Sequence, residues 1–352
     1  MKRKKEKVCI AMSGGIDSSV AAAILKKQGY DCVGIFMKFW SDQEGTQKVI
    51  NKCCSIESFE TARKVSHQLN FPIYTLNFKQ PFKKQVVDDF LSQFQSGLTP
   101  NPCINCNKFI KFDLLWQKAR VLGCNYLATG HYIKKTTNQL LRAKDKNKDQ
   151  SYFLYNLKQS QLKHLLFPLG NYTKTQVRAM AKKWNLPAKN RPESQEICFV
   201  SGKSHNEFLK HHLKLKPGSI VTTQCKTVGQ HKGLPLYTLG QRKGIKVGGI
   251  GPFYVVKMNY KTNTLIVSEK KDDSLLYHKI FRIKNTNWIN GKPRKTLNCE
   301  VKIRHQAPSV KCKIINNQVT LSKPLRAITP GQSAVFYKNQ QLLGGGVIDK
   351  TF

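Results

Sequence analysis

The chain has 352 residues, 40% of them hydrophobic and 10% aromatic, which excludes a disordered protein and allows two or three domains with ample core. No apolar run approaches the ~20 residues that a membrane-spanning helix needs. Lys and Arg number 60 against 20 Asp and Glu, a formal charge of +40, which favours nucleic acid over a membrane surface as partner, although part of it reflects a lysine-rich compositional bias.

The first half of the chain alternates strand and helix patterns. Short apolar runs predict four strands, at residues 8–12, 32–37, 73–78 and 126–132. Amphipathic stretches predict five helices, at residues 18–29, 55–70, 82–94, 111–123 and 173–187. This alternation predicts an α/β domain, a mainly parallel sheet with helices on both faces, whose ligands bind beyond the carboxyl ends of the strands.

The pattern changes after about residue 205. Short alternating runs such as YVVKM and TLIVS, with turn residues between them, predict antiparallel strands, and the same pattern continues from about residue 276 to the end. We therefore expect an N-terminal parallel-sheet domain over residues 1–205, a small β domain over 206–275 and a C-terminal β-barrel domain over 276–352. Residues 138–157 form a polar, lysine-rich excursion before the second half begins.

The strongest motif is AMSGGIDSS, residues 11–19, at the junction of the first strand and the first helix. Backbone amides at a helix N-terminus favour phosphate, and Gly14 and Gly15 permit a tight turn. The motif is neither the Walker loop G-x-x-x-x-G-K-[ST] nor the dinucleotide motif G-x-G-x-x-G. Asp17, placed among phosphates, is suited to the magnesium ion that accompanies ATP.

This motif resembles the PP-loop of the ATP pyrophosphatases, which attach AMP to a substrate oxygen and release pyrophosphate. The resemblance implies further ATP contacts from the ends of neighbouring strands. The ATP-binding residues that we expect are Ala11, Met12, Ser13, Gly14, Gly15, Ile16, Asp17, Ser18, Met37 and Gly130.

Cys103 and Cys106 form a C-x-x-C behind two prolines, in PNPCINC. Such a pair can bind zinc, exchange electrons, help to hold an iron–sulfur cluster or do covalent chemistry. A structural zinc site typically needs a second such pair, and the adjacent Cys53 and Cys54 suit chelation poorly. Cys198, in ESQEICFV, is a further candidate thiol, against the alternative of a lone buried cysteine. Eleven scattered cysteines indicate a reducing, cytoplasmic environment.

Seven blocks, in order along nearly the whole chain, resemble the tRNA-specific 2-thiouridylases of the MnmA type: SGGIDS, TPNPCINCNKFIKF, ATGHY, KDQSYFLY, ESQEICFV, GLPLYTLGQRKGI and VKIRH. The resemblance implies a PP-loop domain, a small β domain and a β-barrel, and 2-thiolation of the wobble uridine of tRNA. It implies Cys106 as the nucleophile and Cys198 as the carrier of a persulfide. The tRNA-binding residues that it implies are Asn101, Pro102 and Cys103 against the target base, with Lys148, Asp149, Gln150, Arg304 and His305.

Two positions depart from the family pattern. Many relatives carry Asp where Cys103 stands, so any role of that acid would fall to a thiol here. An aromatic such as Tyr is expected at His305, and histidine can also stack on RNA. We further expect the helix that begins after Cys106 to lower the pKa of that thiol through its N-terminus.

The expected chemistry starts from the poor leaving-group character of uracil O2. Adenylation converts this oxygen into AMP, a persulfide sulfur on Cys198 attacks C2, and Cys106 attacks the persulfide and closes a disulfide with Cys198. The wobble base has to leave the anticodon stack to enter such a pocket.

The resemblance implies ATP with Mg²⁺, tRNA and a sulfur-donating protein, either a cysteine desulfurase or a relay. We expect a monomer with no membrane partner.

Three alternatives remain open from the sequence. Cys103, Cys106 and Cys198 can together hold an iron–sulfur cluster with one open iron. Another PP-loop ligation of tRNA, or an amide synthesis, would explain the ATP loop but leaves the cysteines without a role. A basic RNA-binding module with a vestigial ATP site is a third reading, which the intact S-G-G-x-D-S disfavours.

Overall fold

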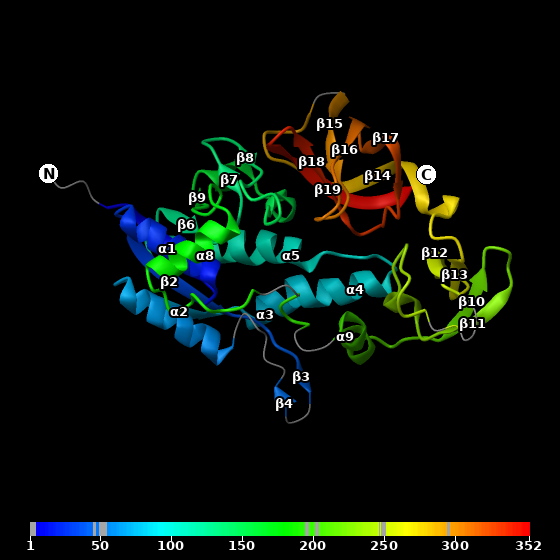
Figure 1. Cartoon of the computed structure of the whole chain (residues 1–352), viewed down its shortest axis with the longest axis horizontal. Coiled ribbons are helices and arrows are strands. Elements are labelled where there is room, and N and C mark those ends of the chain that lie inside the picture. Colours follow the sequence, from blue (N-terminus) through cyan, green and yellow to red (C-terminus); the bar gives the residue numbers. More distant parts are fainter. Residues whose placement is uncertain are drawn as a thin grey trace.

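The computed structural model describes residues 5–44, 47–48, 55–193, 197–200, 204–245, 247, 251–293 and 296–352, so that Cys53 and Cys54 lie outside it. Figure 1 shows an N-terminal α/β domain in blue to green, a small sheet made of β10 to β13, and a barrel in orange to red. The predicted fold class is confirmed. Within the described residues, no helix combines the length and the apolar character needed to cross a bilayer.

The N-terminal domain is built on a five-stranded parallel sheet, and its strand order is β5-β2-β1-β6-β9. These strands span Ile73–Asn77, Asp31–Lys38, Lys7–Met12, Tyr126–Ala128 and Leu165–Leu166. The strand predicted at 126–132 is therefore too long. It stops at Ala128 because the next residues turn toward α1, where Gly130 packs against the backbone of Asp17.

Helices cover both faces of this sheet, as the alternation predicts. They are α1 (Ile16–Lys27), α2 (Ile56–Gln68), α8 (Lys174–Lys183), the continuous helical run from α3 to α4 (Lys79–Gln95) and the run from α5 to α6 (Pro102–Val121). The middle of each run is π-helical, at Lys83–Asp88 and Cys106–Leu114. Alternate residues of β1 enter different cores: Cys9 packs with the two long runs, whereas Val8 and Ile10 pack with α1 and α2.

The small central sheet follows α9 (His205–His212), and its strand order is β11-β10-β13-β12. Its strands span Thr227–His231, Gly218–Thr222, Thr264–Ser268 and Tyr254–Asn259. The sequence pattern predicts antiparallel strands, but β10 and β13 pair in parallel. The reason is the connection: the chain crosses from β11 through a long segment to β12 before β13 returns beside β10.

The C-terminal domain is a six-stranded antiparallel barrel closed by pairing of β14 with β19. Its strands are β14 (Tyr277–Trp288), β15 (Thr296–Lys302), β16 (Val310–Ile315), β17 (Gln318–Arg326), β18 (Ser333–Lys338) and β19 (Gln341–Thr351). Alternation decides which side chains enter it. Val310, Cys312 and Ile314 of β16 are buried while the residues between them are exposed.

The polar excursion at 138–157 fastens the barrel to the N-terminal domain. A hairpin of β7 (Lys134–Lys135) and β8 (Leu140–Leu141) extends the barrel sheet, because β8 pairs with β19. The buried Tyr152 then donates its hydroxyl to the Ser333 carbonyl at 2.8 Å, and Asn287 donates to the Tyr155 carbonyl at 2.7 Å. Sequence alone gave no sign that this segment joins two domains.

Replacement of Tyr152 by Phe tests the importance of this junction. The change leaves a buried carbonyl without its donor, which costs about 1–3 kcal/mol, so we expect a lower thermal unfolding midpoint. The control is Tyr74→Phe, since Tyr74 is exposed and surface changes stay within about 0.5 kcal/mol. Calorimetry on both variants decides it, and equal midpoints would contradict a stabilising role for the junction.

Candidate active site

The glycine loop between β1 and α1 is held by backbone on both sides. Gly14 has φ +74, and a Cβ there would lie 2.1 Å from the carbonyl oxygen of Ser58, so only glycine fits. Opposite, a Cβ at Gly130 would lie 2.9 Å from the backbone of Asp17 and Ser18. The loop is therefore shaped before any ligand arrives, and the first turn of α1 faces a cavity.

That cavity, which we call the loop cavity, has a volume of about 350 Å³ and lies beyond the carboxyl ends of β1, β2 and β6. The predicted ATP-binding residues line it with the exception of Met12 and Gly14. Its volume is in the range of small-molecule sites. The strand-to-helix amides and serine hydroxyls are the donors that a phosphate chain requires.

Asp17 is already engaged by two groups that line the loop cavity. Its Oδ1 accepts hydrogen bonds from Nζ of Lys174 at 2.6 Å and from the hydroxyl of Tyr132 at 2.7 Å. Burial, and then the charge of Asp17, raise the pKa of Tyr132, so its hydroxyl remains a donor. Sequence reasoning treated residues 173–187 only as a helix and missed Lys174.

Glu193 gathers three cations at the rim of the same cavity. Lys148, Lys174 and Arg178 approach its carboxylate at 2.5, 3.3 and 3.0 Å. Burial alone would raise its pKa, but the hydrogen bond from Lys148 and the charge of Lys174 lower the pKa of Glu193 to about 2. Two carboxylates, those of Asp17 and Glu193, meet three cations here, so this cluster, within a lysine-rich chain, is suited to an anionic ligand.

A second cavity, of about 230 Å³, holds the candidate thiols, and we call it the thiol cavity. Cys103, Cys106 and Cys198 all line it, together with Pro102 and Phe199. Cys106 is buried, Cys198 is half-buried and Cys103 is exposed. Residues 92 positions apart in the sequence, Cys106 and Cys198, thus face one space.

The two cavities share a wall. The residues that line both are Ser13, Met37, Lys111, His131 and Gln150. Only this layer of side chains therefore lies between a phosphate bound at the glycine loop and a thiol of the second cavity. The two cavities are therefore immediate neighbours.

Two residues of the thiol cavity carry unusual polar groups that sequence reasoning did not single out. The ring of His131 is buried and is hydrogen-bonded to the Thr129 hydroxyl at 2.8 Å. Burial, and then the charge of Lys111, hold the pKa of His131 well below its ordinary value, so its ring is neutral. Asn107 donates to the Phe153 carbonyl at 3.2 Å, while its buried Oδ1 has no hydrogen-bond partner among the described residues. His131 lies inside the ATGHY block, which was its only signal.

The helical run that carries the cysteines begins earlier than expected. Asn101 caps α5 by accepting from the Cys103 amide at 3.2 Å, and Pro102 occupies its first turn. The expectation that a helix begins after Cys106 is thus wrong. Cys103 lies in the first turn, and Cys106 begins the π-helical stretch, a feature frequent at functional sites.

The remaining residues expected to bind tRNA fall into two groups. Lys148 and Gln150 line the loop cavity, and Gln150 Oε1 also accepts from the Tyr132 amide at 2.9 Å. The Asp149 carboxylate, in contrast, is buried and accepts hydrogen bonds from the Ala143 and Ser151 amides at 3.0 and 3.3 Å, so that it shapes the loop.

Both barrel residues of that prediction lie at the junction with the N-terminal domain or close to it. Arg304 donates to the Ala327 carbonyl at 2.9 Å. The ring of His305 is bonded to the Asp149 carbonyl at 2.9 Å and lies 4.5 Å from the ring of Phe153, a residue of the thiol cavity. At the position where the family pattern predicts an aromatic residue, the ring of His305 therefore packs against the ring of Phe153.

Three family models match the chain in succession. They are described as a tRNA methyl transferase HUP domain at residues 6–202, a tRNA methyl transferase PRC-barrel domain at 206–269 and an aminomethyltransferase beta-barrel domain at 278–348. Among solved structures, NMN synthetase from Francisella tularensis is 19% identical, with a TM-score of 0.36 over 58% of this chain and 71% of that one.

The curated relatives are similar over nearly their whole length. The tRNA-specific 2-thiouridylase MnmA of Carboxydothermus hydrogenoformans is 43% identical over 98% of both chains. The MnmA protein of Clostridium perfringens (strain ATCC 13124) is 42% identical over 98% of this chain and 99% of its own. Identity at this level, with all three domains matched and the glycine loop and thiols in place, shows that the chain belongs to the MnmA family of tRNA-specific 2-thiouridylases.

Proposed function

We propose that this protein is a tRNA-uridine 2-sulfurtransferase that uses ATP to replace O2 of the wobble uridine by sulfur. The observation that supports it best is the wall shared by the loop cavity and the thiol cavity. A base between them can receive AMP from one side and sulfur from the other. The formal charge of +40 suits a tRNA substrate.

The loop cavity is the proposed ATP site. The amides of the first turn of α1 and the hydroxyls of Ser13 and Ser18 bind phosphate, and Lys174 adds a positive charge. Asp17 is the carboxylate placed to hold the magnesium ion that ATP brings, and it would share its charge between that ion and Lys174. The proposed first reaction is attack of uracil O2 on the α-phosphorus, with pyrophosphate leaving.

Sulfur transfer then uses two thiols of the thiol cavity. The terminal sulfur of a Cys198 persulfide attacks C2, and the C2–O bond breaks as AMP leaves. The Cys106 thiolate attacks Sγ of Cys198, the sulfur–sulfur bond breaks, and the transferred sulfur remains on C2. The two cysteines end as a disulfide, so an external thiol must reduce them and a sulfur-donating protein must reload Cys198 before the next turnover.

The base itself would lie against the segment that precedes Cys106. Asn101, Pro102 and Cys103 are the proposed contacts, and Pro102 and Cys103 line the thiol cavity. Pro102 stiffens this turn because its φ is fixed. Lys148, Asp149, Gln150, Arg304 and His305 are the proposed contacts to the rest of the tRNA, and the Asp149 carboxylate also accepts a hydrogen bond within the loop. The matched segments support the proposed domains, residues 1–205, 206–275 and 276–352.

A second mechanism deserves a test because three cysteines, not two, line the thiol cavity. Cys103, Cys106 and Cys198 would then hold an iron–sulfur cluster whose fourth iron binds the incoming sulfide. The reaction on tRNA would be the same, but the thiols would serve as ligands and no disulfide would form.

Replacement of Cys198 by Ser separates sulfur transfer from adenylation. We expect thiolation of an unmodified tRNA to fall roughly 10³-fold or more, since the sulfur carrier is lost, while tRNA-dependent ATP–pyrophosphate exchange continues. Mass spectrometry of the tRNA nucleosides measures the exchange of oxygen for sulfur. The control is Cys225→Ser, an exposed thiol outside both cavities. Unchanged thiolation in Cys198→Ser would exclude the proposed role.

Replacement of Lys174 by Met tests the ATP site. The change removes the cation beside Asp17, and we expect pyrophosphate exchange to slow about 10²-fold, as for the loss of one transition-state donor. Lys182→Met is the matched control, because Lys182 is an exposed lysine of the same helix. Equal rates in both variants would remove Lys174 from the site.

Iron analysis after anaerobic purification decides between the two sulfur mechanisms. We expect a colourless, iron-free protein to be fully active and Cys103→Ser to keep most of the activity, because only Cys106 and Cys198 exchange sulfur. Visible absorption, iron content and thiolation are measured on the same preparation. Activity that follows iron content, and that disappears with Cys103, would favour the cluster.

A further inference from the structure

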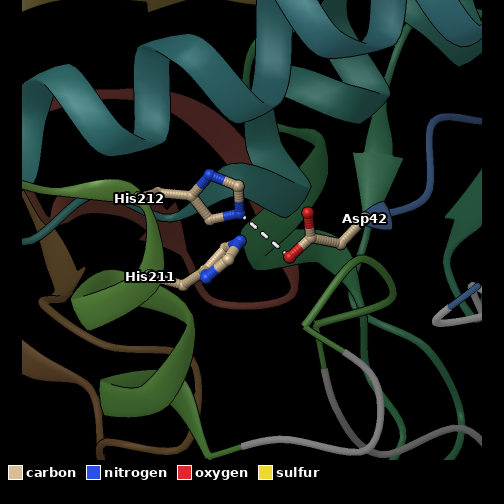
Figure 2. A group of neighbouring side chains, drawn as sticks. All are labelled: Asp42, His211 and His212. Atoms are coloured by element: carbon tan, nitrogen blue, oxygen red, sulfur yellow. Dashed lines mark hydrogen bonds and ion pairs between the residues drawn. The ribbon is translucent and has the colours of Figure 1, made fainter. Parts of the chain in front are cut away.

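We propose that Asp42, His211 and His212 form a binding site for a divalent transition cation of the Zn²⁺ type, apart from both cavities. One ligand atom from each residue lies within 4.8 Å of the other two. Figure 2 shows the two imidazoles of α9 turned toward the carboxylate of Asp42, which lies just beyond β2. None of the three residues lines the loop cavity or the thiol cavity.

The carboxylate is the fixed part of this site. Asp42 is only 5% exposed, and its Oδ2 lies 3.0 Å from Nε2 of His212. The ring of His212 is held in place by Phe208 and Trp40, with ring centroids at 4.5 and 6.0 Å. A buried carboxylate and a packed imidazole give a cation two ligands with little loss of side-chain freedom.

The second imidazole is what distinguishes this group from an ordinary aspartate–histidine pair, which needs only one ring. Consecutive residues of a helix point in different directions, but α9 ends at His212 and the chain is extended at Leu213, so both rings can turn to one side. The negative end of the α9 dipole also lies here, and it favours a cation.

Ligand chemistry indicates the class of cation. Two imidazoles and one carboxylate, with a fourth position for water, are a common tetrahedral zinc set. Imidazole selects Zn²⁺, Co²⁺, Ni²⁺ or Cu²⁺ over Mg²⁺ and Ca²⁺, which prefer oxygen. None of these three ligands is a thiolate, so this site is distinct from any metal site that the cysteines could form.

The position of the site suggests what it does. Asp42 belongs to the connection that leaves the parallel sheet, whereas α9 leads into the central sheet. Phe208 of α9 lies 5.4 Å from Phe199, the residue after Cys198. A bound cation would fasten α9 to the segment that follows β2, close to Phe199 of the thiol cavity, and the role that we assign to it is to hold these two segments together.

Cobalt substitution provides a direct test, because the eleven cysteines of the chain can also bind metal. The full-length protein is treated with a chelator, freed of it and titrated with Co²⁺. A site of imidazole and carboxylate gives visible d–d absorption without the intense near-ultraviolet charge transfer that thiolate ligands produce. We expect one such equivalent, which Zn²⁺ displaces, and a rise in the thermal unfolding midpoint when Zn²⁺ is added.

His211→Gln and His212→Gln are the decisive variants, since glutamine keeps a polar side chain but binds these metals poorly. Each is expected to weaken Zn²⁺ binding at least about tenfold and to abolish the thermal shift, with circular dichroism unchanged. Lys210→Gln on the same helix is the control and should bind like the parent. The proposal is overturned if the cobalt spectrum shows thiolate ligands only, if no cation binds, or if Lys210→Gln loses as much affinity as the histidine variants.

Discussion

The turn between β1 and α1 is clamped between two other stretches of backbone, and the rest of the site depends on this close packing. Gly14 meets the Ser58 carbonyl of α2 on one side, and Gly130 meets Asp17 on the other. A Cβ at either position would push these segments apart. The contact with Gly130 also ends β6 early, which sends His131 inward between the two cavities. One steric constraint thus shapes the phosphate loop and places the wall beside it.

Residues 148–157 connect this wall to the barrel. Gln150 lies in the wall, and a few residues later Tyr152 and Tyr155 bond to Ser333 of the barrel at 2.8 and 3.1 Å. His305 returns from the barrel to the carbonyl of Asp149. A rigid chain of hydrogen bonds therefore runs from the barrel to the edge of both cavities, so the barrel helps to determine the shape of the site.

Local patterns were sufficient to predict the parallel sheet, the glycine loop and the three cysteines that line the thiol cavity. The loop depends on adjacent residues, and alternation along the chain reports burial. Lys174 and Glu193 could not be found in this way, because an ion pair between distant residues leaves no periodic signal. The parallel pairing of β10 with β13 was missed for a similar reason, since a crossover has no mark in either strand. The burial of the Asp149 carboxylate could not be predicted either, because it depends on the folded loop around it.

The pairing of β19 has a consequence for the order in which the chain folds. This last barrel strand contacts β18, β14 and β8, so it closes the barrel and also covers the open edge of the β7–β8 hairpin. During synthesis the hairpin emerges about two hundred residues before its partner. Until then the N-terminal domain carries an unpaired strand edge and lacks the barrel carbonyl that Tyr152 binds. Ribosome-bound intermediates of this protein therefore lack the barrel side of the site, because the pairing of β19 with β14 and with β8 forms last.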